Sequence, residues 1–138
     1  MNDKQTAAIK QRLKSYTALL REIENEEERA DMLNSETPGE ITGKRRERTR
    51  KSLEALHTKE DAENSALESL LNSATPDERA VIRMRYFDLA SWDNIINAIF
   101  GAETDFIENA ENYKARTFRL HGQALLKMAK ALESSKSK

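Results

Sequence analysis

The stretch SWDNIINAIFG, residues 91–101, predicts a short helix with one buried face. Ser91 suits the N-cap position, because its hydroxyl can accept a hydrogen bond from a free N–H of the first helical turn. The apolar residues recur at the three- and four-residue spacing of one helix face, and they are Trp92, Ile95, Ile96, Ile99 and Phe100. Gly101 stands where helices commonly end. We therefore expect this helix to end at Gly101 and to bury Trp92 in the core.

A second helix is predicted directly before this stretch, in ATPDERAVIRMRYF, residues 74–87. Thr75 can cap it, Pro76 fits its first helical position, and Glu78 completes a capping box with Thr75. Its apolar face consists of Val81, Ile82, Tyr86 and Leu89. The sequence thus predicts two short helices in succession.

A third helix is predicted in YKARTFRLHGQALLKMAKAL, residues 113–132, with one apolar and one basic side. The apolar side gathers Thr117, Phe118, His121, Leu125, Met128 and Leu132. The opposite side gathers Arg116, Arg119, Gln123, Lys127 and Lys130. Arginine can bind guanine and glutamine can bind adenine through paired hydrogen bonds, and lysine neutralises phosphate. The pattern fits a DNA-binding surface, but an ordinary solvated helix face, the more frequent case, has the same pattern.

The N-terminal half predicts two long helices. A heptad seam with one polar position, Glu27, steps by four and three residues as in a coiled coil, and its members are Ile9, Leu13, Tyr16, Leu20, Ile23, Glu27 and Ala30. The segment NSETPGEITG, residues 34–43, holds the turn residues that end this first helix. The spacing returns in a second helix over residues 44–71, at Leu53, Leu56, Glu60, Glu63, Leu67 and Leu70. An antiparallel hairpin of two helices has a small core, so we expect a second copy of the chain to complete it.

The composition excludes several classes of site. The chain has 138 residues, 34% of them charged, and without cysteine it has no disulfide, thiolate nucleophile or cysteine zinc site. The only histidines, His57 and His121, lie in different segments, so we expect no metal site, no cofactor and no enzymatic activity. The sequence contains neither an apolar run of membrane length nor a signal-peptide core. We therefore expect a cytoplasmic protein that does not enter the membrane.

Charge is distributed unevenly along the chain, although the net charge is −1. Residues 88–111 are acidic, whereas residues 114–138 are basic. The basic run KRRERTRK, residues 44–51, could bind phosphate or nucleic acid, but a hairpin would place it beside the acidic run EIENEEERAD, residues 22–31. We expect these two runs to pair with each other. A basic surface for nucleic acid would then be local rather than spread over the protein.

Two segments of the C-terminal half have a recognisable family pattern, RAVIRMRYFDLASWDNIINAIFG at residues 79–101 and RTFRLHGQALLKMAKAL at residues 116–132. They resemble region 4 of bacterial sigma factors. More closely, the chain resembles phage and prophage proteins of Gram-positive bacteria that join an N-terminal helical hairpin to a sigma region 4-like end with the signature RT-x-R-LHG-x-AL. These proteins are related to late-operon transcription activators of the ArpU and RinA type. The resemblance implies a helix-turn-helix that binds DNA in transcription control.

An acidic insert at residues 102–112 separates the two helices of this helix-turn-helix, where a compact motif needs only a few residues. Its acids are Glu103, Asp105, Glu108 and Glu111. Carboxylates near DNA would repel phosphates. The insert either folds away, with Phe106 and Ile107 as its anchor, or screens the reading helix. The resemblance implies that this insert is a feature of the family.

These observations predict an all-α protein with two domains. We expect a coiled-coil-like helical hairpin that forms a homodimer in residues 1–72, and a sigma region 4-like helix-turn-helix domain in residues 73–138. The expected function is that of a phage-encoded transcriptional regulator that binds specific sequences of double-stranded DNA. The alternative is a helical adaptor that binds RNA polymerase or a phage protein and does not bind DNA.

The expected DNA-binding residues all belong to the basic C-terminal helix. Three of them would read bases or grip the backbone, namely Arg116, Arg119 and Gln123. Three lysines would hold phosphates, namely Lys114, Lys127 and Lys130. Thr117 would make a marginal contact at the edge of the groove.

Overall fold

The structure is a computed structural model that describes residues 3–35 and 39–136, and this part of the chain contains helices and no strand. The elements are α1 (Asp3–Asn34), α2 (Glu40–Leu70), η1 (Leu71–Ser73), α3 (Pro76–Ile82), η2 (Arg83–Phe87), α4 (Trp92–Phe100) and α5 (Ala110–Lys136). η1 is a short 3-10 helix, and η2 is a π-helical turn that continues α3. The predicted all-α class is confirmed. None of the helices within the described ranges combines the length and the apolar character that a bilayer crossing requires.

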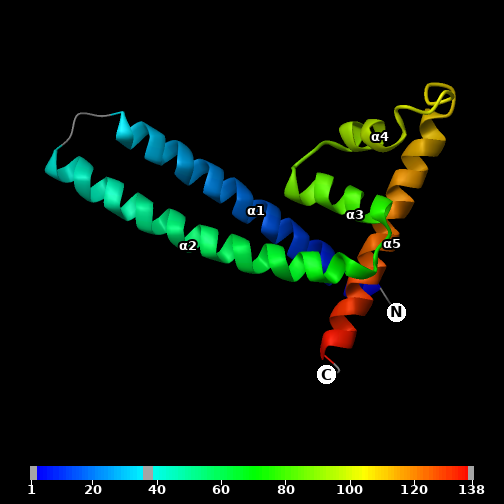
Figure 1. Ribbon diagram of the computed structural model, residues 1–138, viewed down its shortest axis with the longest axis horizontal. Coiled ribbons are helices and arrows are strands. Elements are labelled where there is room, and N and C mark those ends of the chain that lie inside the picture. The colour runs from blue at the N-terminus through cyan, green and yellow to red at the C-terminus, as the bar shows by residue number, and fades with distance from the viewer. Residues whose placement is uncertain (1–2, 36–38, 137–138) are drawn as a thin grey trace.

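Helices α1 and α2 lie side by side and form a long arm (Figure 1). Several positions of the predicted heptad pattern are buried, namely Ile9, Leu13, Tyr16, Ile23, Leu56, Leu67 and Leu70, whereas Glu27 is exposed. Polar contacts also join the helices; near the base of the arm, Arg12 donates to Glu63 at 2.6 Å, and Asn64 donates to the Tyr16 hydroxyl at 3.0 Å. The apolar seam and these contacts together fix the register of the two helices.

The short helices begin at the capping residues that the sequence predicts. The Thr75 hydroxyl accepts from the backbone N–H of Glu78 at 3.2 Å, and the Glu78 carboxylate accepts from the backbone N–H of Thr75 at 2.8 Å. The Ser91 hydroxyl accepts from the backbone N–H of Asn94 at 3.2 Å. Gly101 ends α4, and a Cβ atom there would come within 2.3 Å of the Asn97 carbonyl oxygen. Each capping group therefore satisfies an N–H that the first helical turn leaves free.

A shared core joins the base of the arm to the C-terminal helices, where α5 crosses the ends of α1 and α2 (Figure 1). Its members come from α1, α2, η1, α3, η2 and α5 and include Ile9, Leu13, Leu67, Leu71, Tyr86, Leu125 and Met128. The predicted division between residues 72 and 73 falls next to Leu71, which is fully buried in this core. The two-domain organisation stays a prediction, and the two parts pack directly against each other.

The acidic insert folds back on the start of α5 instead of projecting freely. Phe106 is partly buried and stacks on Tyr113, with 5.9 Å between the ring centroids. Asp105 accepts a hydrogen bond from the Tyr113 hydroxyl at 2.5 Å and another from Asn109 at 2.9 Å. Phe106 is thus an anchor of the insert, as expected, but Ile107 is not, because 89% of its surface is exposed.

Trp92 is only partly buried, so the expectation that it lies fully in the core is wrong. It occupies the first position of α4 and lies between η2 and α5 at the edge of a cavity. Its indole ring makes edge contacts with Phe118 and His121, and the Arg85 guanidinium lies 4.8 Å above its centroid. The deeper residues of the α4 stripe, Ile95, Ile96 and Phe100, are buried as predicted.

Candidate nucleic-acid interface

The candidate interface is the basic ridge, which we define as the five α5 residues Arg116, Arg119, Gln123, Lys127 and Lys130. Lys127 is partly exposed and the other four side chains are exposed. The opposite side of α5 is buried against the rest of the protein, through residues that include Thr117, Ala124, Leu125 and Met128. The helical spacing that directs one side into the core therefore directs the ridge into solvent.

Thr117 belongs to the core and not to the surface. It is fully buried, and its hydroxyl donates to the Tyr113 carbonyl oxygen one turn earlier at 2.8 Å. The predicted contact between Thr117 and the edge of a DNA groove is therefore wrong. The physical reason is its place on the wheel, because Thr117 shares the buried side of α5 with Ala124 and Met128.

Arg116, at the first end of the ridge, is held against aromatic rings. Its guanidinium carbon lies 4.8 Å from the centroid of Phe100 and 5.4 Å from that of Tyr113, and these two rings stack on each other. A cation above an aromatic face is attracted by the negative potential of the ring. Arg116 is thereby restrained, which lowers the entropy that it would lose on gripping a phosphate or a base.

Lys127 has a partner within the protein. Its Nζ donates to Glu78 Oε1 at 2.6 Å, and only 4% of the Glu78 side chain is exposed. Burial tends to raise the pKa of Glu78, but the hydrogen bonds from Lys127 and from the backbone of Thr75 outweigh burial and lower it. Glu78 is therefore ionised and holds Lys127 at the α3 capping box. A DNA phosphate would have to compete with this carboxylate for Lys127. In this respect Lys127 differs from Lys130, which is exposed.

Lys114 is exposed but lies on another side of α5. It precedes Phe118 by one turn and His121 by two, so it continues the stripe of α5 that packs on Trp92. The structure therefore does not bring Lys114 together with Arg119 and Lys130 on one face.

The acidic insert borders the first end of the ridge. Asp105, Asn109, Arg116 and Arg119 line the same surface depression. The Asp105 carboxylate is occupied by Tyr113 and Asn109, as described above, so it is oriented toward the start of α5. Because Arg119 and Gln123 are both exposed, the insert leaves the middle of the ridge accessible.

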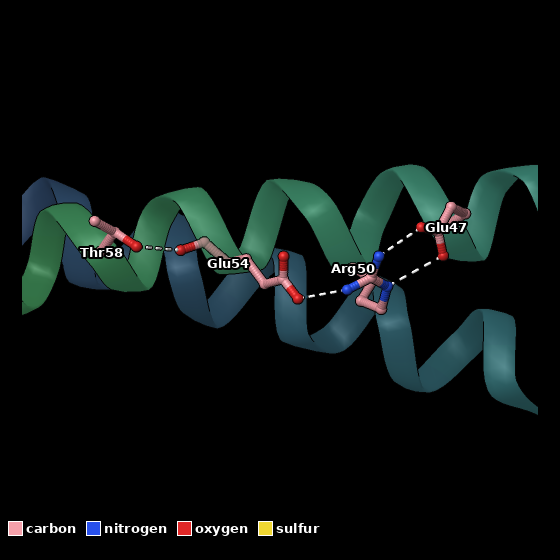
Figure 2. A network of polar contacts seen from close by, with 4 residues as sticks. All are labelled: Glu47, Arg50, Glu54 and Thr58. Carbon is pink, nitrogen blue, oxygen red and sulfur yellow. Dashed lines mark hydrogen bonds and ion pairs between the residues drawn. The ribbon is translucent and has the colours of Figure 1, made fainter.

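Arg50, in the basic run at residues 44–51, pairs within the protein, but with other carboxylates than the sequence predicts. Figure 2 shows Arg50 between Glu47 and Glu54, two carboxylates of the same helix α2. Across the arm, the Arg46 guanidinium donates to the backbone carbonyl of Leu33 at 2.7 and 2.9 Å. The partners of Arg50 are thus the acids of α2 itself and not the acidic run of α1.

Residues 3–35 and 39–136 contain no group of three His, Cys, Asp or Glu side chains arranged to hold a metal ion. The sequence pattern did not predict a group of cationic residues outside the ridge, namely Lys10, Lys14, Arg21 and Arg85 around one cavity.

Comparisons with protein-family models, with curated proteins and with solved structures found no match.

Proposed function

We propose that this protein is a phage-encoded transcriptional regulator that binds specific sequences of double-stranded DNA in the cytoplasm of a bacterial host. The proposal is supported chiefly by the basic ridge, which is exposed along α5 while the opposite side of the helix is buried. In a sigma region 4-like arrangement, α4 would be the support helix and α5 the reading helix.

The residues of the ridge take different roles in this proposal. Arg119 lies in the first half of α5 and Gln123 lies at its centre, and in this proposal these turns of the reading helix enter the major groove. Both side chains can make paired hydrogen bonds to base edges. Lys130 lies two turns further along, where a reading helix leaves the groove and meets phosphates. Arg116, the most N-terminal member of the ridge, would bind the phosphate backbone of the DNA.

Arg119→Ala is expected to weaken binding to a preferred DNA site by ~1–3 kcal/mol and to weaken binding to random DNA less. Lys130→Ala is expected to weaken binding to all sequences alike and to lower the slope of log affinity against log salt by about one unit. A preferred site would first be selected from genomic fragments with the purified protein. Titrations at several salt concentrations would then compare both variants with the wild type.

Lys59→Ala is the matched control, because Lys59 is an exposed lysine of α2 away from the ridge. It removes one positive charge and should bind DNA as the wild type does. If the wild type, Arg119→Ala and Lys130→Ala bind DNA equally, the ridge is not the DNA surface. An adaptor that binds RNA polymerase or another phage protein would then be the better description.

We further propose that the arm forms a homodimer through its distal half. Beyond the shared core, few of the arm residues whose burial the structure describes are buried, namely Ile23, Leu33, Thr49 and Leu56. Met32, near the end of α1, is 67% exposed. A second copy of the arm would cover Met32, and burial of a methionine side chain contributes ~1.5–3 kcal/mol.

Sedimentation of the full chain is expected to show a dimer at micromolar concentration, and Met32→Lys is expected to shift it toward the monomer. Lysine keeps a helix-compatible chain of similar length but places a charge in the interface. Lys59→Gln is the control. It replaces an exposed side chain of α2 and should leave the dimer unchanged. A wild-type chain that stays monomeric over this concentration range would contradict the dimer.

A further inference from the structure

A cavity of about 460 Å³ lies between the arm and the C-terminal helices. Its walls come from α1, from η2 and the residues that follow it, from the first residue of α4, and from α5. Four of its side chains are cationic, namely Lys10, Lys14, Arg21 and Arg85, and no carboxylate is among the described residues that line it. We call this cavity the cationic cleft.

Three of the four cations share one face of α1. Lys10 and Lys14 are one helical turn apart, and Arg21 follows two turns later on the same side. Like charges at this spacing repel each other, so the stripe costs stability unless an anion is bound. Within the described residues, no carboxylate pairs with these three side chains.

Arg85, on the opposite wall, is held in a fixed orientation. Its guanidinium lies 4.8 Å above the Trp92 ring, and its Nη1 donates to the Ala90 carbonyl oxygen at 3.2 Å. An arginine has five N–H donors, so several remain for a ligand. A guanidinium with a fixed plane is suited to the paired hydrogen bonds that a phosphate accepts.

The backbone around Arg85 is irregular. The π-helical turn η2 contains Arg85 and Tyr86, which both line the cleft. Leu89, another lining residue, has a φ of 60° in the left-handed region that residues other than glycine seldom adopt. Both π-helical turns and such strained residues concentrate at functional sites.

The base of the cleft is polar and neutral. The Tyr86 hydroxyl and His121 Nε2 lie 2.8 Å apart and form a buried hydrogen bond. Burial, together with the nearby charges of Lys10 and Arg85, lowers the pKa of His121 to about 4. The two cations thus impose a positive potential on this part of the cleft, which disfavours a further positive charge.

We infer that the cationic cleft binds a small ligand that carries two or more phosphate groups. Its volume lies in the range of small-molecule sites, ~300–1,000 Å³. One phosphate carries at most two charges at neutral pH, so four cations fit a ligand with more than one. A DNA duplex bound at the basic ridge would not occupy the cleft, because His121 is two residues from both Arg119 and Gln123 and points to the other side of α5.

Calorimetric titration of the full chain with tripolyphosphate tests this inference. The wild type is expected to bind tripolyphosphate, and the double variant Lys14→Gln with Arg21→Gln to bind it roughly 100-fold more weakly, because it loses two charge-assisted contacts. Both residues are exposed and glutamine is a good helix former, so the variant should fold normally. Lys59→Gln is the matched control on α2. In the wild type, the NMR titration of His121 should move to higher pH when tripolyphosphate binds, because an anion stabilises the imidazolium.

Further ligands and variants separate the alternatives. Adenosine triphosphate that binds more tightly than tripolyphosphate would identify the ligand as a nucleotide, and adenosine alone should not bind. Arg119→Ala should keep tripolyphosphate affinity, which separates the cleft from the ridge. The inference is overturned if tripolyphosphate does not bind at millimolar concentration, or if the double variant binds it as the wild type does. It is also overturned if the double variant loses only DNA binding, since the cleft would then be part of a DNA surface.

Discussion

Leu71→Ala is expected to lower the free energy of unfolding by ~2–5 kcal/mol, which is a large part of the ~5–15 kcal/mol that stabilises a typical protein. Leu71 is fully buried in η1, between the end of α2 and the start of α3. Its side chain belongs to the shared core, so its loss leaves a cavity where the arm meets α5. Urea denaturation, followed by the helical circular dichroism signal, would measure the change.

The same experiment tests whether the shared core couples the two parts of the chain. If it does, the wild type should unfold in one cooperative transition. Ile107→Ala is the control, because Ile107 is 89% exposed and its loss should change stability by less than ~0.5 kcal/mol. Two separate transitions, with Leu71→Ala affecting only one of them, would show that the arm and the C-terminal helices fold independently.

Local signals predicted the helices well. The capping box of Thr75 and Glu78 and the N-cap at Ser91 depend on residues three positions apart, so the sequence alone shows them. The packing of the helices depends on contacts across long separations. The Thr17 hydroxyl, for example, donates to the Tyr86 carbonyl oxygen at 3.0 Å across 69 positions of sequence, and no periodicity predicts that contact.

The ridge was predictable as a helix face, but the surroundings of its members were not. Thr117 lies on the apolar side of the helical wheel, so its burial follows from periodicity, and its assignment to DNA contradicts that pattern. The partner of Lys127 could not be predicted, because Glu78 is 49 residues away and meets it only after α3 packs on α5.

The cationic cleft had a signal in the sequence that was not recognised. Lys10, Lys14, Thr17 and Arg21 repeat the heptad spacing one residue after the apolar seam. A basic stripe of this kind normally faces solvent, so the spacing alone does not indicate a site. Only the fold brings Arg85 and Trp92 to the opposite wall and turns the stripe into one side of a cavity.

Acidification from pH 6.5 to pH 4 is expected to destabilise the protein through His121. This side chain is 9% exposed, and burial, Lys10 and Arg85 lower its pKa from 6.5 to about 4. Between these two values the unfolded chain takes up a proton that the folded chain does not. The contribution of neutral His121 to the free energy of unfolding therefore has its full value above pH 6.5. It falls as the pH decreases toward 4, by ~1.4 kcal/mol per pH unit and ~3 kcal/mol in total.

Urea denaturation at a series of pH values would measure this slope, and His121→Gln is expected to flatten it between pH 6.5 and pH 4. His57→Gln is the control, because the His57 side chain is 49% exposed and lies on the surface of α2. Carboxylates titrate in a lower pH range. A hydrogen bond from Arg83 lowers the pKa of Glu68 below 4.5, so the stability that Glu68 contributes is lost only as the pH falls below this value.

A pH slope of the free energy of unfolding that is the same in the wild type and in His121→Gln would mean that the Tyr86–His121 pair is not buried in the neutral form. Tripolyphosphate should reduce the slope of the wild type, because an anion in the cationic cleft raises the pKa of folded His121 toward that of the unfolded chain.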